Sequence, residues 1–469
     1  MAVVGIDLGT QSVKVAAVGA DGRVLAAATR PYPVRSPHPG WAEADPAEWL
    51  AATVDAANEV VATSPEPAQA VGLSGQMHGV VLCAADGTPL RPAITWADGR
   101  SAEQAARISG ELGAGELARL GSAAFPGFAG PTLAWLADHE PDMIGAARWA
   151  LQPKDWLRLM LTGDAATDPS DASGTLLYDI VAGGWSEAAL AAARVRPDLL
   201  PRVMPSSAIG GVARRAAGSL DGLPVVVGGA DAACGIRGLG LTAGHGAIAL
   251  GTGTQISSVL DSPRPDETLR THTFATTGDI GESWYRLGAV QSGGLALERA
   301  LAWLGADTAE AQRALAQGVE SADPLFFPFV AGERSPYLDP TLRAGWRGLS
   351  LGTSREAMLR SVLEGMAYAV SAAYDAVGDS GAAPAEPVTL LGGGSRDAAY
   401  VQLLATSLGA ALRPAQVGDA TVVGAARLAD ALIPPAGVRE DDIVNARDDA
   451  VVAERRARWL SAVERRGAL

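Results

Sequence analysis

The sequence predicts an α/β protein built from two similar lobes. A short phrase occurs twice, since Leu8–Ser12 reads LGTQS and Leu250–Gln255 reads LGTGTQ. Each phrase lies between two apolar or alternating runs, so each half of the chain is expected to contain a strand–turn–strand unit. The 469 residues also exceed what one hydrophobic core usually supports. Strand and helix patterns alternate in both halves, which defines the α/β class.

The first lobe is expected to open with an antiparallel sheet. Alternating runs predict strands over Val3–Leu8, Val13–Val18 and Val24–Ala28, the last two joined by a hairpin turn at Asp21-Gly22. Asp45 followed by Pro46 is typical of a helix start, and the pattern continues to about Thr63. Three further strands are expected to continue this sheet: Ala70–Leu73, Val80–Ala84 and Ala93–Trp96.

Residues 101–220 are predicted to be mainly helical, an insertion carrying substrate-side surface, with loops at Phe125–Pro131 and Thr167–Gly174. A buried strand, Pro224–Gly228, then leads through two glycines to Asp231 and a helix over Ala232–Gly238. We place the lobe boundary between residues 240 and 241, which divides the chain into 1–240 and 241–469. Expected in the second lobe are strands at Ala247–Leu250, Gln255–Leu260 and Val388–Leu391, helices after Gly293 and Ser354, and a helix to Leu408 that follows the Gly392–Gly394 turn.

Composition limits the partners and the location. The net charge of -15 makes non-specific binding to nucleic acid or an anionic membrane surface unfavourable. Cys83 and Cys234 are the two cysteines, too few for a disulfide framework, which fits a reducing cytoplasm. Asp7 interrupts the first apolar run, unlike a signal peptide. The uncharged stretch Gly238–Leu260 is too rich in Gly, Thr, Ser and Gln for a membrane span.

The two repeated turns are candidate phosphate-binding loops. Backbone amides in Gly9-Thr10-Gln11 and Gly251-Thr252-Gly253 can point at a phosphate without an intervening side chain. Asp7 ends the strand before the first turn, where its carboxylate would hold a hydrated magnesium ion. The alternatives are two ordinary β-turns and an Asp that satisfies turn amides. A similar turn at matching places in both halves favours the functional interpretation.

Asp231 is the candidate catalytic base. It follows two glycines at the carboxyl end of a buried strand, where ligand sites of α/β proteins usually lie. There it would accept the proton of a substrate hydroxyl that attacks phosphorus. The alternative role is the N-cap of the following helix, and one residue can serve both.

Two polar clusters are candidate sugar contacts. Gln76-Met77-His78 would form a polar wall, although a lone His is more often a neutral, hydrogen-bonded residue of a turn. Trp96 and Asp98 stand beside Arg100, and the alternative for this cluster is a local Asp–Arg ion pair on a loop, which contributes little.

In combination, these motifs resemble the FGGY carbohydrate kinases, and among them the xylulokinases. The resemblance runs from Val3 to about Asp430. It is most specific at Gly5–Thr10, Gly75–Gly79, Trp96–Arg100, Pro153–Arg158, Ser170–Thr175, Gly228–Asp231, Gly332–Pro336 and Leu391–Ser395.

The resemblance implies two actin-like (ribonuclease-H-like) ATPase lobes around a central cleft, and a homodimer. It implies ATP-dependent phosphorylation of D-xylulose to D-xylulose 5-phosphate, with Asp231 as general base and Asp7 near Mg²⁺. Matching positions are Met77 and His78 at the sugar, Thr10, Gln11, Thr252 and Gly253 at the phosphates, and Gly393 and Gly394 at the adenosine.

Four positions depart from the family pattern: Ala97, Thr132, Tyr337 and Arg347. Ala97 and Thr132 belong to the sugar-binding lobe, so the exact sugar stays open. Another pentulose or polyol, such as ribulose or arabinitol, is the first alternative. A non-catalytic, actin-like nucleotide-binding protein is the second, and the glycine-rich setting of Asp231 argues against it.

Overall fold

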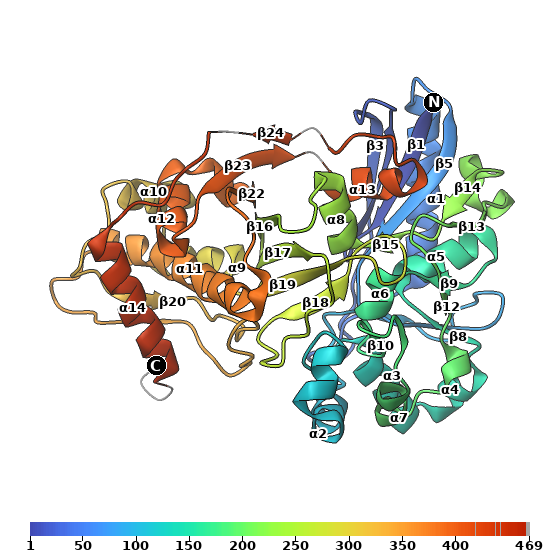
Figure 1. The fold of residues 1–469 in the computed structure, drawn as a ribbon, viewed down its shortest axis with the longest axis horizontal. Coiled ribbons are helices and arrows are strands. Elements are labelled where there is room, and N and C mark those ends of the chain that lie inside the picture. The colour runs from blue at the N-terminus through green and yellow to red at the C-terminus, as the bar shows by residue number, and fades with distance from the viewer. Residues whose placement is uncertain (418, 437, 441, 466–469) are drawn as a thin grey trace.

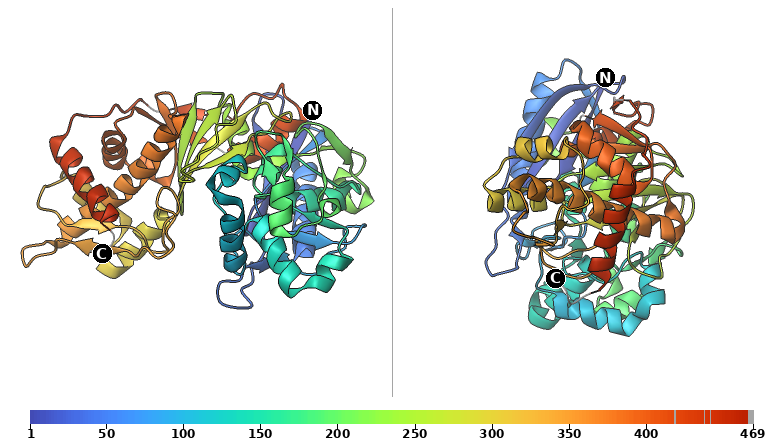
Figure 2. Two further views of the ribbon diagram at one scale, coloured as in Figure 1. Left: turned by 60° about the horizontal axis from the view of Figure 1, so that its bottom comes forward. Right: turned by 90° about the vertical axis from the view of Figure 1, so that its left-hand side faces the viewer.

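The computed structural model describes residues 1–465 except 418, 437 and 441. Two seven-stranded sheets lie side by side, one in each half of the chain (Figure 1). The helices of residues 102–193 gather on one side of the first sheet (Figure 2). The α/β architecture predicted from the alternating patterns is therefore present.

The first sheet has the order β13-β14-β5-β1-β2-β3, with β15 also paired to β5. β1 is antiparallel to β2 and parallel to β5. The first candidate phosphate turn thus joins β1 to β2. The strands are β1 (Ala2–Leu8), β2 (Ser12–Val18), β3 (Val24–Pro31), β5 (Ala68–Gly75), β13 (Ile209–Val212), β14 (Pro224–Val226) and β15 (Gly229–Ala230).

The second sheet repeats this topology in the order β18-β19-β17-β16-β22-β23-β24. β16 is antiparallel to β17 and parallel to β22, as β1 is to β2 and β5. The second candidate turn joins β16 to β17, so the duplication predicted from the repeated phrase is confirmed. The strands are β16 (Gly246–Leu250), β17 (Thr254–Leu260), β18 (His272–Ala275), β19 (Trp284–Val290), β22 (Val388–Gly392), β23 (Leu412–Val417) and β24 (Val438–Glu440).

Helices cover both sheets, and in the described chain seven of the fourteen α-helices begin after a residue whose side chain caps them. Asp45 caps the first helix and Ser354 the longest one, as their sequence contexts predict. The helices of the first half are α1 (Pro46–Thr63), α2 (Ala102–Arg119), α3 (Ala129–His139), α4 (Pro141–Ala146), α5 (Pro153–Thr162), α6 (Pro169–Ser173), α7 (Glu187–Ala193) and α8 (Asp231–Leu239). Those of the second half are α9 (Gly294–Leu304), α10 (Thr308–Leu315), α11 (Arg355–Val377), α12 (Ala398–Leu408), α13 (Ala420–Ala429) and α14 (Ala450–Glu464).

Helix α13 packs on the first sheet although it lies near the end of the chain (Figure 1). Val423 and Ala426 join the buried cluster of Val3 and Val18. The approach is so close that a Cβ on Gly72 would lie 1.8 Å from the Ala425 carbonyl oxygen. The first sheet is thus covered by residues from both halves of the sequence.

Several predicted elements are wrong in detail. Val80–Ala84 and Ala93–Trp96 do not continue the first sheet, because the turn after β5 redirects the chain. Instead, small two-stranded sheets pair β6 (Val81–Cys83) with β8 (Trp149–Leu151) and β4 (Glu43–Ala44) with β7 (Ala93–Ile94). Further two-stranded sheets pair β9 (Ala166–Thr167) with β12 (Arg202–Val203), β10 (Tyr178–Asp179) with β11 (Gly184–Trp185), and β20 (Leu325–Phe327) with β21 (Gly345–Arg347).

The predicted loops also contain helical residues. The stretch Thr167–Gly174 includes helix α6, whose N-cap Asp168 accepts hydrogen bonds from Ser170 and Asp171. Asp168-Pro169 is the same start signal as Asp45-Pro46. The end of the other predicted loop forms the start of α3. No helix in the described part of the chain combines the length and apolarity needed to cross a bilayer.

Candidate active site

The first candidate phosphate turn is held by side chains from neighbouring elements. The Gly9 carbonyl oxygen accepts hydrogen bonds from Tyr32 Oη at 2.6 Å and Gln76 Nε2 at 3.2 Å. Trp96 Nε1 donates to Thr10 Oγ1 at 2.9 Å. Gln76 and Trp96, both expected at the sugar, therefore bond to this turn. The neighbouring Gln11 is exposed.

The second candidate turn borders a cavity of about 550 Å³. Gly251 and Thr252 line one side and Gly393 and Gly394 another, so four predicted nucleotide contacts meet there. Gly253 lies within the same turn, where its carbonyl oxygen accepts from Gly251 N at 2.9 Å. Apolar side chains complete the walls: Leu295, Leu297, Leu363, Met366 and Val370. Amides beside an apolar chamber of this size suit a nucleotide.

Asp7 and Asp231 line one cavity of about 300 Å³. Burial and the nearby Asp231 carboxylate raise the pKa of Asp7 to about 7. Burial raises the pKa of Asp231 to about 6. The two carboxylates are thus close enough to influence each other, and each gains affinity for a proton or a cation.

Asp7 has an oxygen atom suited to a cation. Its buried Oδ1 has no hydrogen-bond partner among the described residues. No group of three or more His, Cys, Asp or Glu side chains with metal-binding geometry occurs in the part of the chain that the structure describes. Mg²⁺ binds through one or two carboxylates, phosphate oxygens and water, so this donor set fits magnesium.

Asp231 is the first residue of α8, and the N-cap position falls on Ala230. The N-cap alternative for Asp231 is therefore wrong. Its Oδ1 accepts from the adjacent Ala232 N at 2.7 Å, and its side chain faces the cavity that it shares with Asp7. This arrangement leaves carboxylate lone pairs available to a substrate hydroxyl.

A fully buried ionic cluster supports the main chain before Asp231. Lys154 Nζ lies 2.6 Å from Asp155 and 3.2 Å from both Asp168 and Asp171. Asp168 accepts a hydrogen bond from Ser170 Oγ, which in turn accepts from the Ala230 N–H at 2.9 Å. The cluster therefore fixes the peptide that leads into α8, the helix that carries Asp231.

His78 occupies a strained turn after β5. Its φ is 72°, a left-handed conformation that is uncommon outside glycine and often found at functional sites. Its Nδ1 lies 2.6 Å from the Gly174 carbonyl oxygen and so donates to it. Burial lowers the pKa of His78 to about 3. The neutral ring, stacked on Phe128 with centroids 4.0 Å apart, keeps Nε2 as an acceptor.

Tyr285 contacts Met77 and experiences the charge of Asp231, and sequence reasoning missed it. Its Oη donates to Met77 Sδ at 3.7 Å, and its pKa is raised well above the usual value by burial and then by the charge of Asp231. It extends from β19 of the second sheet. The alternation around Trp284–Val290 was a signal for that strand, but nothing local indicated a partner 208 residues away.

Asp98 and Arg100 form the local ion pair of the alternative interpretation, but the pair is buried. Both side chains are 1% exposed, and Asp98 Oδ2 also accepts from Ala42 N at 2.6 Å. The Arg100 guanidinium lies 3.5 Å from the ring centroid of Trp41. Asp98 is thus engaged inside the protein, and a contact between Asp98 and sugar stays a prediction.

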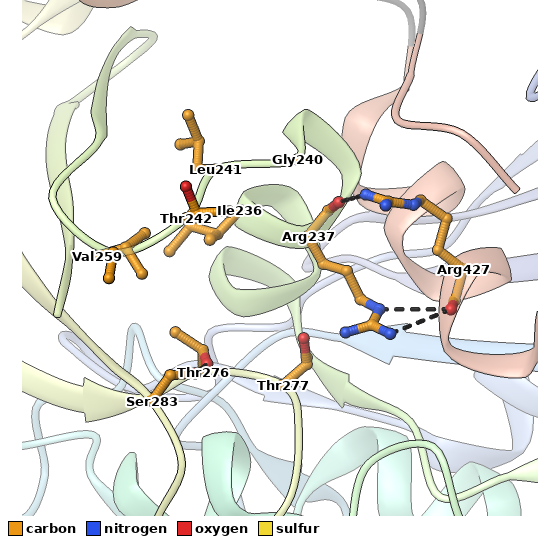
Figure 3. A pocket seen from close by; sticks show the side chains of 11 residues that line it. Ile236, Arg237, Gly240, Leu241, Thr242, Val259, Thr276, Thr277, Ser283 and Arg427 are labelled. Atoms are coloured by element: carbon orange, nitrogen blue, oxygen red, sulfur yellow. Dashed lines mark hydrogen bonds between the residues drawn. The ribbon is translucent and has the colours of Figure 1, made fainter. Parts of the chain in front are cut away.

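A third cavity, of about 350 Å³, lies at the carboxyl end of α8. Arg237 and Arg427 line it, and each guanidinium donates to the main-chain carbonyl of the other residue (Figure 3). Cations favour the carbonyl ends of helices, so the two side chains cap α8 and α13 reciprocally. These hydrogen bonds link helices α8 and α13, which pack against each other.

Comparisons with known proteins agree with this geometry. Residues 2–238 match the N-terminal domain, and residues 246–432 the C-terminal domain, of the FGGY family of carbohydrate kinases. The chain is 35% identical over 441 residues to a xylulose kinase of Escherichia coli (strain K12), covering 92% of this chain and 90% of that protein.

Solved structures have the same fold. The crystal structure of a protein named xyloylose kinase from Brucella ovis is 31% identical with a TM-score of 0.92, and the match covers 99% of both chains. A xylulose kinase from Rhodospirillum rubrum is 25% identical with a TM-score of 0.90, over 99% of this chain and 98% of that one. The two sheets described above are thus the two lobes of the fold shared by these kinases.

Proposed function

The chain belongs to the FGGY family of carbohydrate kinases, and on that premise we propose that it transfers the γ-phosphoryl group of ATP to the terminal hydroxyl of D-xylulose. The observation that supports this reaction best is the cavity shared by Asp7 and Asp231. The sugar assignment draws on the xylulose kinases that the chain resembles in sequence over most of its length.

Asp231 is proposed to act as the general base. A carboxylate with a pKa of about 6 is ionised at neutral pH but remains basic enough to accept a proton. It takes the proton of the 5-hydroxyl as that oxygen attacks the γ-phosphorus, and ADP leaves on the opposite side. Met77 and His78 hold the rest of the sugar, with Gln76, Trp96 and Asp98 as further proposed contacts.

The two turns are proposed to hold the phosphates. We assign the amides of Thr10 and Gln11 to the phosphates from the first half, and those of Gly251, Thr252 and Gly253, beside the nucleotide cavity, from the second. Gly393 and Gly394, on the wall of the same cavity, are the proposed contacts of the adenosine. Asp7 is the proposed residue for Mg²⁺. When bound, this ion supplies positive charge that offsets the charge of the transferring phosphoryl group.

The experiment is to measure ADP formation by the wild-type protein and by Asp231→Asn, with Mg²⁺ and a panel of pentuloses and polyols. We expect turnover with D-xylulose and a loss of about 10²- to 10⁴-fold in the variant. Asp142→Asn, in exposed helix α4, is the matched control and should keep full activity.

If only another sugar of the panel is turned over, that sugar replaces D-xylulose as the proposed substrate, and Asp231 remains the proposed base. Unchanged activity of Asp231→Asn would remove Asp231 from the mechanism. Absence of sugar-dependent turnover across the panel would favour a nucleotide-binding protein without transfer activity.

Assembly and location are further parts of the proposal. We infer a homodimer from the family resemblance and a cytoplasmic location from the two cysteines, which are unpaired and buried. Light scattering on the purified protein tests the first, since a mass near 47.7 kDa would contradict the dimer. Cell fractionation tests the second.

A further inference from the structure

The segment Gly332–Pro336 reads GERSP, and the proposed chemistry assigns it no role. It lies between β20 and β21 of the second half. The buried Glu333 carboxylate accepts from Gln291 N at 2.6 Å and from Arg334 N at 2.8 Å. Ser335 N donates to the Ala289 carbonyl oxygen at 2.9 Å. These bonds fasten the main chain on both sides of Arg334 to the end of β19.

The Arg334 guanidinium has no recorded hydrogen bond or ion pair within the described ranges. Its central carbon lies 5.2 Å from the ring centroid of Phe125. Phe125 belongs to the helical region of the first half, so this side chain extends from one half of the chain to the other. A guanidinium has five N–H donors, so an arginine without an acidic partner can serve a ligand.

The surface that Arg334 reaches is the wall that bears His78. Phe125 and Phe128 have ring centroids 6.0 Å apart, and Phe128 stacks on His78. The pKa of His78 is lowered by burial and additionally by the charge of Arg334, and His272 experiences the same two influences. The guanidinium therefore lies near these imidazole rings.

The groups on this wall are complementary to a neutral sugar. His78 Nε2 can accept a hydrogen bond from a hydroxyl, and the ring faces suit the C–H groups of a carbohydrate. A ketone oxygen, in contrast, only accepts hydrogen bonds. The Arg334 guanidinium, whose central carbon lies 5.2 Å from the Phe125 ring centroid, is a strong donor at this wall.

We propose that Arg334 is a sugar-binding residue contributed by the second half, donating hydrogen bonds to the ketone oxygen and an adjacent hydroxyl of the bound ketopentose. This inference rests on the proposed function, because it needs a sugar in the site. Met77 adjoins His78 in sequence, and its partner Tyr285 experiences the charge of Asp231. We therefore assign Arg334 to the end of the sugar that is remote from the reacting hydroxyl. A sugar held in this way contacts both halves at once.

The test compares Arg334→Met with Arg343→Met. Arg343 lies in the same connection between β20 and β21, and its guanidinium donates to main-chain carbonyls at an exposed position, so it is a matched control. Steady-state kinetics give the KM for D-xylulose and for ATP. Calorimetry with D-xylulose alone gives sugar affinity without turnover. Arg334→Gln is the second variant, and circular dichroism checks that both variants fold.

We expect Arg334→Met to raise the KM for D-xylulose and the calorimetric Kd roughly tenfold to hundredfold, as for a lost charged hydrogen bond. The KM for ATP should stay within about twofold, and Arg343→Met should match the wild type. Arg334→Gln retains an amide group that donates hydrogen bonds. Its KM and Kd for D-xylulose should therefore lie between those of Arg334→Met and those of the wild type.

An unchanged KM and Kd for D-xylulose in both Arg334 variants would overturn the inference while leaving the kinase proposal intact. A rise in the KM for ATP with sugar affinity unchanged would assign the guanidinium to the nucleotide instead and also overturn it. If the wild-type protein neither binds nor phosphorylates any sugar of the panel, the proposed function fails first, and this inference fails with it.

Discussion

At the scale of single residues, three of the candidate site residues have a pKa that is shifted by burial. Asp7 and Asp231 both have a raised pKa, while the pKa of His78 is lowered. Burial disfavours the charged form in each case, which is why acids and bases move in opposite directions. Such shifts cluster at functional sites, and here they coincide with residues chosen from sequence alone.

The shift of Asp231 predicts a pH dependence of activity. Its carboxylate must be ionised to accept a proton, so kcat/KM for D-xylulose should fall about tenfold per pH unit below about pH 6. Initial rates from pH 4.5 to 8 measure this limb. Nucleotide binding followed over the same range separates protonation of the base from a loss of ATP affinity. A profile that stays flat down to pH 5 would contradict the assignment.

The two lysines of the chain predict a contrast in stability. Lys154→Met leaves three buried carboxylates without their cation and should lower the free energy of unfolding by about 3–5 kcal/mol. Lys14→Met removes a partly exposed pair with Asp419 and should cost about 1 kcal/mol or less. Urea unfolding at pH 7 measures both, and equal losses would show that the buried cluster has no special structural role.

At the scale of elements, helices α8 and α13 meet at a closely packed crossing next to Asp231. A Cβ on Gly424 would lie 1.8 Å from the Cys234 carbonyl oxygen. Gly235 lies next to Cys234 in helix α8. A Cβ on Gly235 would have Thr421 Oγ1 of α13, at 3.8 Å, as its nearest neighbour. Alanine at Gly424 would therefore clash with the main chain of α8, whereas alanine at Gly235 tests only the general effect of alanine in a helix.

We predict that Gly424→Ala lowers the free energy of unfolding by about 1–3 kcal/mol, because the added methyl group forces the helices apart. Gly235→Ala should be neutral or raise it by up to about 1 kcal/mol, since alanine is the better helix former. Thermal and urea unfolding test both variants. A stable Gly424→Ala protein would mean that the crossing can relax without cost.

Local sequence signals predicted individual helices and turns well. They predicted contacts between distant residues poorly. The hairpin at Asp21-Gly22 and the cap at Asp45 depend on neighbouring residues, so the sequence indicated them correctly. Strands β18 and β19 were missed although they are neighbours in sequence and pair with each other. Two other strands were assigned to the wrong sheet, because their partners β4 and β8 lie far along the chain. The same limit hid Tyr285 and its contact with Met77.

At the scale of the whole molecule, the repeated topology explains why the repeated phrase was informative. The same hairpin begins each sheet, so both turns fall at equivalent places in the two halves. The sequence therefore predicted the positions of the two turns whose backbone amides are proposed to bind phosphate. It did not predict that α13 covers the first sheet, since an amphipathic helix does not specify which sheet it packs against.

The position of α13 predicts that the two halves are not independent. Residues 1–240 expressed alone lack the cover of Val423 and Ala426 over Val3 and Val18, so this fragment should aggregate or bind a hydrophobic dye. Co-expression with residues 241–469 should restore soluble protein. Solubility and dye binding measure the outcome, and a monomeric, folded fragment 1–240 would contradict the prediction.

The return of α13 to the first sheet also sets an order of events during synthesis. Strands β1 and β2 leave the ribosome long before their covering helix, which begins only at Ala420. One face of the first sheet therefore stays uncovered until α13 has been made, available to chaperones and to neighbouring nascent chains. Helix α8, which carries Asp231, likewise acquires its partner only at that point.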